Sequence, residues 1–483
     1  MKQQKKKWSI GVMEHWSNGT KPSSLSAPFQ HSNTPTLHLS KFSLSAVARM
    51  LNSALLGAAL LFTTSCALLG PRLETKPADP YFAKFAPVKA PAVAGLLLQK
   101  GDRLAIIGDS ITEQKMYSRI IETYLTVCVP ELQVTARQYG WSGETAEGFL
   151  RRMTNDCLRF QPTIATTCYG MNDHRYKPYD SKVAAWYRTN QTAIVRAFKA
   201  AGTRVVLGSP GCVGKMPHWV KSATGTVEDL NLSLCQFRNH DLAIAQAEGV
   251  RFADVFWPMF TAGFAAQQKC GADYAVPGKD GVHPGWAGQT IMAYAFLKAL
   301  GLEGDLGTFT VDLAGNKATA TAGHVVDSLK DGVLTVTSSR YPFCATGELN
   351  QDSSIRSGMT LVPFNEKLNR LQLVVQGATA ANYKVTWGET SRTYTAAQLA
   401  KGVNLADDFV INPFSAAFKK VDDAVGAKQS YETEQIKKIF HGPEGKADME
   451  AAVMKTEAVR APLAEAIKAA FQPVTHSLKI EAQ

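Results

Sequence analysis

Short apolar runs alternate with stretches of helical spacing between residues 98 and 302. In the helical stretches apolar residues recur every three to four positions, as at Met116, Ile120 and Tyr124. Such alternation favours right-handed βαβ units and a parallel sheet with helices on both faces, so we expect an α/β domain over 98–302. The predicted strands are 103–107, 132–136, 162–169, 204–207 and 251–256, and the predicted helices are 113–127, 186–200, 230–247 and 286–300.

The pattern changes after the glycine-containing segment 301–307. Four short runs rich in β-branched and apolar residues follow, and they predict a β-rich accessory unit over residues 303–411. These runs are 308–311, 333–336, 371–375 and 383–387. Helical spacing then returns at 416–439 and 447–471, which predicts a helical tail over residues 412–483.

The N-terminal part lacks this alternation. Residues 1–40 are rich in Ser, Thr, Pro and Lys, which is typical of disorder, and residues 71–97 are rich in Pro and Ala, which predicts a linker. Between them, an apolar run over 55–62 ends in Thr63-Thr64-Ser65-Cys66 and resembles a bacterial lipoprotein signal. We therefore expect residues 1–70 to hold a disordered N-terminus and an export signal, with lipidation of Cys66.

This signal departs from the usual pattern in two ways. Thr63 stands where Leu is usual, and about fifty residues precede the apolar run. Secretion with cleavage nearby is therefore one alternative, and a short core helix is another. With lipidation at Cys66 or with simple secretion, the mature protein lies in the cell envelope, in the periplasm or outside the cell. A lipid anchor is the only membrane contact that we expect.

Composition narrows the classes of partner. The chain has 483 residues, 45% of them hydrophobic, which is enough for a sizeable core in two or three domains. The formal net charge is +11, but the basic residues form no stripe interleaved with aromatic residues, so no nucleic-acid partner is expected. Seven cysteines remain beside Cys66, and their spacing fits neither a disulfide framework nor a zinc site. No cofactor or metal is expected.

The block Gly108-Asp109-Ser110 follows the first predicted strand. Because a predicted helix begins soon after it, Ser110 lies in a strand-to-helix turn, at the edge where open α/β sheets bind their ligands. A hydroxyl placed there can serve as a nucleophile if a base is near. The plainer alternative is that Ser110 only caps the helix.

Two further blocks offer hydrogen-bond donors for an oxyanion. Gly143, in Trp141-Ser142-Gly143, lacks a Cβ, so its backbone N–H can approach a reacting carbonyl closely. Asn172 follows the third predicted strand, and its side-chain NH₂ can donate to a developing negative charge. Each block alone is also compatible with an ordinary loop or turn.

The block Asp280-Gly281-Val282-His283 offers a base. Asp280 and His283 are three residues apart in a compact loop, so Asp280 can accept from one imidazole nitrogen while the other takes a proton from Ser110. Half of a metal site is the rival interpretation, but no second His or Cys stands nearby in a ligand pattern.

Taken together, these blocks resemble the SGNH hydrolases, also called GDSL-type esterases and lipases. The four letters fall on Ser110, Gly143, Asn172 and His283, and the orienting acid of the family falls on Asp280. The resemblance covers residues 98–302 and implies a flavodoxin-like three-layer fold with a five-stranded parallel sheet. It also implies that Ser110 is the nucleophile and that the Ser110 N–H joins Gly143 and Asn172 in an oxyanion hole.

The expected function is that of an exported serine esterase that removes short acyl groups, above all acetyl, from carbohydrate. Trp141, His174 and Tyr176 flank the oxyanion blocks and are candidate substrate-binding residues for a small-molecule or polysaccharide ester. Two alternatives remain open at this point: an acyltransferase that uses the same triad, and a cell-surface glycan-binding protein whose triad is vestigial.

Overall fold

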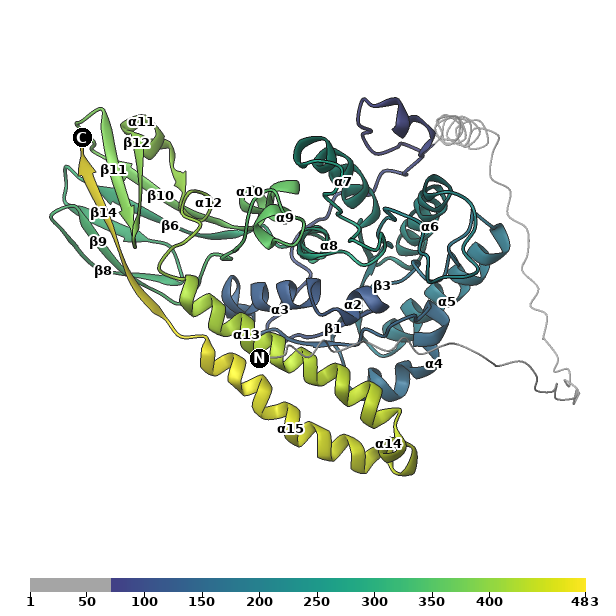
Figure 1. Ribbon diagram of the computed structural model, residues 1–483. Helices are drawn as coiled ribbons and strands as arrows, with labels where there is room; N and C mark the ends of the chain where they lie inside the picture. The colour runs from purple at the N-terminus through teal and green to yellow at the C-terminus, as the bar shows by residue number, and fades with distance from the viewer. Residues whose placement is uncertain (1–70) are drawn as a thin grey trace, which may run out of the picture. The chain divides into compact units, whose positions relative to one another are not determined.

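The computed structural model describes residues 71–483 (Figure 1). The predicted export signal and Cys66 therefore lie outside the described residues. The described residues pack together as one unit. None of their helices is both long enough and apolar enough to span a bilayer, and their seven cysteines are all free thiols.

A five-stranded parallel sheet lies at the centre of the α/β domain, with the strand order β2-β1-β3-β4-β5. Along β1, Leu104 and Ile106 belong to one buried apolar cluster, whereas Ala105 and Ile107 belong to another. Successive side chains of a strand point to opposite faces, so both faces of the sheet are covered. The predicted three-layer α/β fold is confirmed. The strands are β1 (Arg103–Gly108), β2 (Thr135–Gln138), β3 (Ile164–Cys168), β4 (Arg204–Gly208) and β5 (Arg251–Ala253).

Helices cover the two faces of this sheet (Figure 1). The apolar residues of α3, α7 and α8 join the cluster on one face, those of α4 and α5 join the cluster on the other, and α6 contributes to both. The helices are α2 (Ser110–Glu113), α3 (Tyr117–Val127), α4 (Ala146–Asp156), α5 (Ser181–Ala200), α6 (Val227–Glu248), α7 (Phe256–Cys270) and α8 (Trp286–Ala299), with short 3₁₀ turns η2 (Pro130–Leu132) and η3 (Leu158–Phe160).

Residues 71–97 pack against the α/β domain, so the prediction of a linker is wrong for this segment. The segment contains a short 3₁₀ turn, η1 (Pro80–Lys84), and a bridge between Leu73 and Val88. Phe82 and Phe85 are fully buried, with their ring centroids 5.5 and 4.8 Å from that of Phe260 on α7. The Pro/Ala-rich composition gives no sign that Phe82 and Phe85 are buried. Their burial stabilises the packing of this segment against the domain relative to a free tether.

The predicted β-rich region holds two sheets. One has the order β13-β10-β6-β7 and the other the order β12-β11-β14-β9-β8, in which β14 is the C-terminal strand Val474–Ala482. Its strands are β6 (Asp305–Asp312), β7 (Lys317–Ala320), β8 (His324–Lys330), β9 (Val333–Ser338), β10 (Arg370–Gln376), β11 (Asn382–Trp387), β12 (Thr390–Thr395) and β13 (Val403–Asn404). Its helices are α9 (Ile355–Leu361), α10 (Phe364–Leu368), α11 (Ala396–Lys401) and α12 (Leu405–Asp408).

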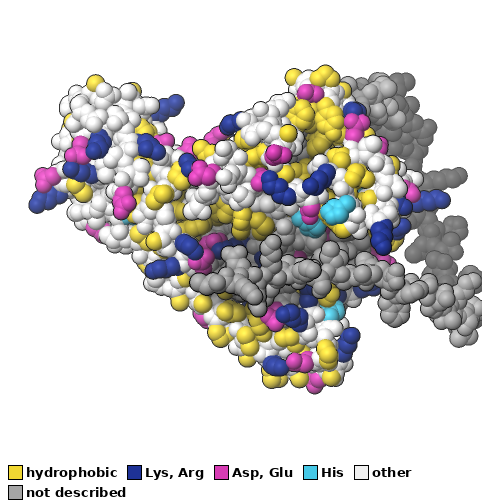
Figure 2. All heavy atoms as spheres, in the orientation of Figure 1, with side chains coloured by type: hydrophobic (Ala, Val, Ile, Leu, Met, Phe, Trp, Pro, Cys, Tyr) yellow, Lys and Arg dark blue, Asp and Glu magenta, His cyan; other side chains and the backbone are white. Residues whose placement is uncertain are grey.

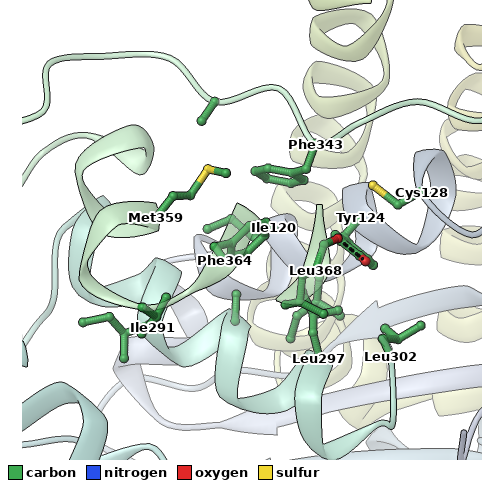
Figure 3. Packing of buried hydrophobic residues seen from close by; sticks show 14 of the residues in the cluster. Ile120, Tyr124, Cys128, Ile291, Leu297, Leu302, Phe343, Met359, Phe364 and Leu368 are labelled. Atoms are coloured by element: carbon green, nitrogen blue, oxygen red, sulfur yellow. Dashed lines mark hydrogen bonds between the residues drawn. The ribbon is translucent and has the colours of Figure 1, made fainter. Parts of the chain in front are cut away.

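The accessory unit shares an apolar core with the α/β domain (Figure 3). Phe343 and Phe364 pack with Tyr124 of α3, at ring-centroid distances of 6.3 Å each. The Tyr124 hydroxyl also donates a hydrogen bond of 2.6 Å to the carbonyl oxygen of Leu368. The packing is therefore continuous across this junction.

The C-terminal segment is helical as far as residue 470 but ends in a strand, so the prediction of a wholly helical tail is wrong for its last residues. β14 (Val474–Ala482) pairs antiparallel with β9 and β11 and lies between them in the second sheet. Its buried positions alternate, and β-branched and aliphatic residues in this period fit a strand.

The helical part is a hairpin that lies along the α/β domain (Figure 1), and we call residues 415–470 the C-terminal arm. The arm consists of α13 (Ser415–Glu434), a π-helical turn η4 (Gln435–Phe440), α14 (Pro443–Ala447) and α15 (Met449–Ala470). Its outer surface shows apolar side chains among charged ones (Figure 2), with Met454 and Val459 of α15 exposed.

Candidate active site

Ser110 lies where the sequence places it, in the turn between β1 and α2. Asp109 caps α2, since its Oδ1 accepts a hydrogen bond of 2.9 Å from the Ile111 N–H. The helical stretch predicted over 113–127 is interrupted at Lys115, whose φ is 57°, so α2 and α3 are separate. Ser110 is the first residue of α2 and is half-buried.

Asp280 and His283 lie in the turn that precedes α8, close to Ser110. The Ser110 Oγ is 2.8 Å from the His283 Nε2, and the His283 Nδ1 is 2.7 Å from the Asp280 Oδ2. The Asp280 Oδ1 accepts two backbone hydrogen bonds of 2.9 Å, from Val282 and His283, which fix its orientation. The His283 Nδ1–H donates a hydrogen bond to the Asp280 carboxylate, which leaves Nε2 free to accept the proton of the Ser110 hydroxyl.

The charges of this group stabilise one another. Burial opposes the charged form of His283, but the hydrogen bond and charge of Asp280 outweigh it and raise the pKa of His283 above its usual value. Burial likewise acts to raise the pKa of Asp280, but three hydrogen bonds from Val282 and His283 lower that pKa to about 2. Asp280 is therefore ionised at neutral pH.

Gly143 lies in the exposed loop between β2 and α4. Its φ is 76°, a conformation that favours glycine, and among residues 71–483 no heavy atom outside Gly143 and its two chain neighbours lies within 4 Å of the position where a Cβ would stand. Within residues 71–483, the Gly143 N–H and the Ser110 N–H donate to no other group. Both can therefore donate to an oxygen of a bound ligand.

Asn172 follows β3, and two contacts fix its carboxamide. Its Oδ1 accepts a hydrogen bond of 3.1 Å from the Tyr176 hydroxyl, and its Nδ2 donates one of 2.9 Å to the Glu144 carbonyl oxygen. Since an amide nitrogen carries two hydrogens, the second N–H is left for a ligand.

Two buried acids that the sequence reasoning missed support this site. Asp173 is fully buried and accepts hydrogen bonds of 2.9 Å from the Ala146 and Gly170 N–H groups, which ties the ends of α4 and β3 together. Burial raises the pKa of Asp173 and that of Asp109 to about 7. Their positions beside Asn172 and Ser110 were the only sequence signal for them.

Two of the predicted substrate-binding residues are buried. His174 is 2% exposed, its Nδ1 donates to the Met171 carbonyl oxygen at 2.6 Å, and burial lowers its pKa to about 4. Tyr176 is 7% exposed, and its hydroxyl orients Asn172. The prediction that His174 and Tyr176 contact substrate is therefore wrong, because the turn after β3 directs both rings into the core, where their centroids lie 4.9 Å apart.

Two tryptophans lie in loops around the site. Trp141, which the sequence singled out, is half-buried, and its ring contacts His441 of the C-terminal segment edge-on, with centroids 4.9 Å apart. Trp219, in the long loop between β4 and α6, was missed. Its ring centroid is 5.8 Å from that of His283, and the two rings are inclined by 31°. No local motif marks Trp219, since only the fold brings it beside His283.

The described architecture resembles that of a solved structure. A gut microbial diltiazem-metabolizing enzyme is 21% identical and matches with a TM-score of 0.67 over 81% of this chain and 100% of its own. An acetylxylan esterase from Geobacillus stearothermophilus is 23% identical and matches with a TM-score of 0.36 over 43% of this chain and 98% of its own. A search of curated proteins gave no match.

A family model matches the part of the chain that carries the site. The model describes the GDSL-like lipase/acylhydrolase family, and it covers residues 106–291, from β1 into α8. The matched segment includes all the residues of the Ser110, Gly143, Asn172 and His283 blocks described above. Residues 106–291 therefore match the GDSL-like lipase/acylhydrolase family, and this match supports a carboxylic ester hydrolase of the SGNH type.

Proposed function

We propose that this protein is an exported serine esterase that removes short acyl groups from carbohydrate by means of Ser110, His283 and Asp280. The observation that carries the proposal is the unbroken hydrogen-bond chain from the Ser110 Oγ to the Asp280 carboxylate, with links of 2.8 and 2.7 Å. Three donors also remain available, namely the N–H groups of Ser110 and Gly143 and one amide N–H of Asn172, and acyl transfer requires such donors.

The reaction follows from this geometry. The Ser110 Oγ attacks the ester carbonyl carbon as its proton moves to His283 Nε2, and the carbonyl oxygen becomes an oxyanion. The Ser110 and Gly143 N–H groups and the Asn172 amide stabilise that oxyanion. The bond between the carbonyl carbon and the alcohol oxygen then breaks, and His283 gives its proton to the departing alcohol. Water repeats the sequence on the acyl-serine, which releases the acid and restores Ser110.

Trp219 supports a carbohydrate as the alcohol part of the substrate. His283 protonates the leaving alcohol, so that alcohol lies near the imidazole. It therefore also lies near the Trp219 ring, whose centroid is 5.8 Å from that of the imidazole. A flat aromatic face suits the apolar face of a sugar ring. Trp219→Ala should raise KM for an acetylated oligosaccharide at least about fivefold, while kcat/KM for ethyl acetate changes little, because ethanol has no ring to stack.

The apolar run that ends at Cys66 supports export and a lipid anchor. Mass spectrometry of the mature N-terminus tests this part: a chain that starts at Cys66 with a lipid mass supports the anchor. A chain that starts at Met1 in the cytosol contradicts export.

Substrate profiling tests the proposal as a whole. Acetate release from acetylated polysaccharides should exceed turnover of triglycerides and of long-chain p-nitrophenyl esters, and it should be absent in Ser110→Ala. Turnover that increases with acyl length would contradict the short-acyl assignment. Glycan binding without any turnover in the parent protein would favour the binding-protein alternative.

A further inference from the structure

The loop that carries Gly143 lies between the α/β domain and the C-terminal arm. This loop, residues 141–145, has no regular secondary structure, and both Ser142 and Gly143 are exposed. An oxyanion hole acts through donors that are already in position when charge develops. The contacts that hold this loop therefore bear directly on the proposed reaction.

Glu113 and Lys437 hold one side of the loop. Glu113 is the last residue of α2, three positions after Ser110, and its Oε2 accepts a hydrogen bond from the Ser142 N–H. The Lys437 Nζ is 2.8 and 2.9 Å from the two carboxylate oxygens of Glu113. The side chains are 28% and 21% exposed, so this ion pair is partly shielded from water.

The ring of Trp141 brings the arm to the start of the same loop. The Lys437 Nζ lies 5.3 Å from the centroid of the Trp141 ring, and the guanidinium carbon of Arg152 lies 5.1 Å from it. His441 contacts the ring edge-on. Two of these three neighbours belong to the C-terminal segment, so that segment contacts both Trp141 and, through Glu113, the peptide before Gly143.

A series of polar contacts through the buried side chains of Arg152, Asp156 and Glu144 holds the other side. The His441 Nε2 is 2.8 Å from Asp156, and the Arg152 guanidinium bonds both Asp156, at 3.2 Å, and the two carboxylate oxygens of Glu144, at 2.6 Å each. The Glu144 carbonyl oxygen is the acceptor for the Asn172 amide. The positions of Gly143 and Asn172 are thus linked to the same turn of the arm.

That turn has the wide geometry of a π-helix. Residues 435–440 are π-helical, and the His441 N–H donates to the Ile436 carbonyl oxygen, five residues back, at 3.2 Å. Such turns insert one extra residue into an α-helix and are frequent at functional sites. Here Lys437 belongs to the turn η4, and His441 is the first residue after η4. Both contact Trp141 of the loop 141–145.

We propose that Lys437 is a positioning residue for the oxyanion hole. Lys437 orients the Glu113 carboxylate, Glu113 fixes the Ser142 N–H, and this holds the next N–H, that of Gly143, toward the reacting carbonyl. The inference rests on the proposed function, since it assigns Lys437 a part in the same site. The C-terminal arm is accordingly a part of the active site and contributes more than stability.

Lys437→Met tests the inference, because methionine keeps an apolar chain of similar length and removes the charge. We expect kcat for p-nitrophenyl acetate to fall between about 10- and 100-fold while KM stays within about twofold. A misplaced donor stabilises the transition state less but leaves the binding of the ester unchanged. Lys437→Arg should recover most of the loss. Lys438→Met is the matched control: Lys438 is its neighbour in η4, its side chain is 71% exposed and pairs with Glu434 at the end of α13, and this variant should keep the parent kcat.

A double-mutant cycle shows whether Lys437 acts through Glu113. If it does, Lys437→Met combined with Glu113→Ala should reduce kcat no further than Glu113→Ala alone, whereas independent roles would multiply the two effects. A kcat for Lys437→Met equal to that of Lys438→Met would overturn the inference, and so would multiplied effects. If Lys437→Met fails to fold, Lys437→Gln and the Glu113→Ala comparison give the same decision. Loss of turnover in Ser110→Ala together with unchanged turnover in Lys437→Met would reject this inference and leave the proposed function standing.

Discussion

Two regions of this molecule contain a histidine within a chain of hydrogen bonds, and they differ in the group at the end of the chain. In the α/β domain the chain runs from Ser110 through His283 to the Asp280 carboxylate, at the edge of the sheet where Ser110 is open to a ligand. In the β-rich unit a longer chain lies buried between the two sheets, with its histidines 7% and 5% exposed.

The buried chain has only one arrangement of protons. The Trp387 Nε1 can only donate, and it donates to the His476 Nδ1 at 3.1 Å. His476 therefore carries its proton on Nε2 and donates to the Ser338 Oγ at 3.0 Å, and Ser338 donates to the His324 Nδ1 at 2.7 Å. His324 ends the chain by donating to the Leu306 carbonyl oxygen at 2.8 Å. Both histidines are neutral in this arrangement.

The terminal group explains the opposite behaviour of the two regions. Asp280 carries a full negative charge that favours an imidazolium, and the pKa of His283 is raised. The buried chain ends in a neutral carbonyl and begins with a donor that a second imidazole proton would oppose, and burial lowers the pKa of His476 to about 3. A histidine beside a hydroxyl is thus placed to accept a proton in one region and links two sheets in the other.

The largest expected effect on kcat comes from removing the Ser110 hydroxyl from the hydrogen-bond chain of the α/β domain. Ser110→Ala should lower kcat by a factor on the order of 10³ or more without changing the melting temperature, because the nucleophile is lost and little packing changes. The matched variant of the second chain, Ser338→Ala, should lower the melting temperature and leave kcat unchanged. Parallel turnover and thermal unfolding measurements check both, and an active Ser110→Ala would contradict the contrast.

Asn172→Ala should have the next largest effect. Loss of its amide should lower kcat by about 10²–10³-fold with little change in KM, if the amide stabilises the oxyanion only in the transition state. Steady-state kinetics on p-nitrophenyl acetate measure this. A change confined to KM would place Asn172 on the ground state of the substrate instead.

Acid should destabilise the folded protein through the buried hydrogen-bond chain that contains His476. Unfolded His476 takes up a proton near its usual pKa of about 6.5, but folded His476 resists until about pH 3, so its contribution is complete above pH 6.5 and is lost as the pH falls from 6.5 toward 3. Between pH 7 and pH 5 this amounts to about 2 kcal/mol of the free energy of unfolding.

His476→Gln sharpens this prediction, because glutamine can accept from Trp387 and donate to Ser338 without titrating. Urea unfolding at pH 7 and pH 5 should show a smaller acid loss in the variant than in the parent protein. An equal acid loss in both proteins would exclude His476 as the cause.

The first chain should respond to pH through activity. Only neutral His283 can accept the Ser110 proton, so kcat/KM should fall about tenfold per pH unit below a pKa that is raised above 6.5. Asp280→Asn should move this inflection to lower pH, because the carboxylate that favours the imidazolium is gone. A flat profile down to acidic pH in the folded protein would argue against His283 as the base.

The sequence pattern predicts much of the α/β domain. It does not predict the residues that surround and position the candidate active site. The strand at 103–107 and the blocks around Ser110 and His283 are local, so their apolar runs and turn residues predict them. His174 and Tyr176 share the same local signal as Asn172, yet the turn after β3 directs them into the core. Trp219 and Lys437 reach the site only through tertiary packing, which no window of sequence contains.

The C-terminal segment shows the same limit in a different form. The spacing over 447–471 predicts α15, because an amphipathic helix leaves a local period. The sequence does not predict strand β14, since its partners β9 and β11 lie far away in the sequence and a single alternating run follows two helices. The burial of Phe82 and Phe85 is not predicted either, because two aromatic residues in a Pro/Ala-rich segment leave no periodic pattern.

Covalent labelling tests the central claim, that Ser110 is activated by His283, most directly. After a brief treatment with diisopropyl fluorophosphate at pH 8, peptide mass spectrometry should find a single phosphorylated residue, Ser110. Labelling should be absent in Ser110→Ala and slowed at least about a hundredfold in His283→Ala, because a serine without its base is a weak nucleophile. Labelling elsewhere, or Ser110 labelling at an equal rate without His283, would contradict the account.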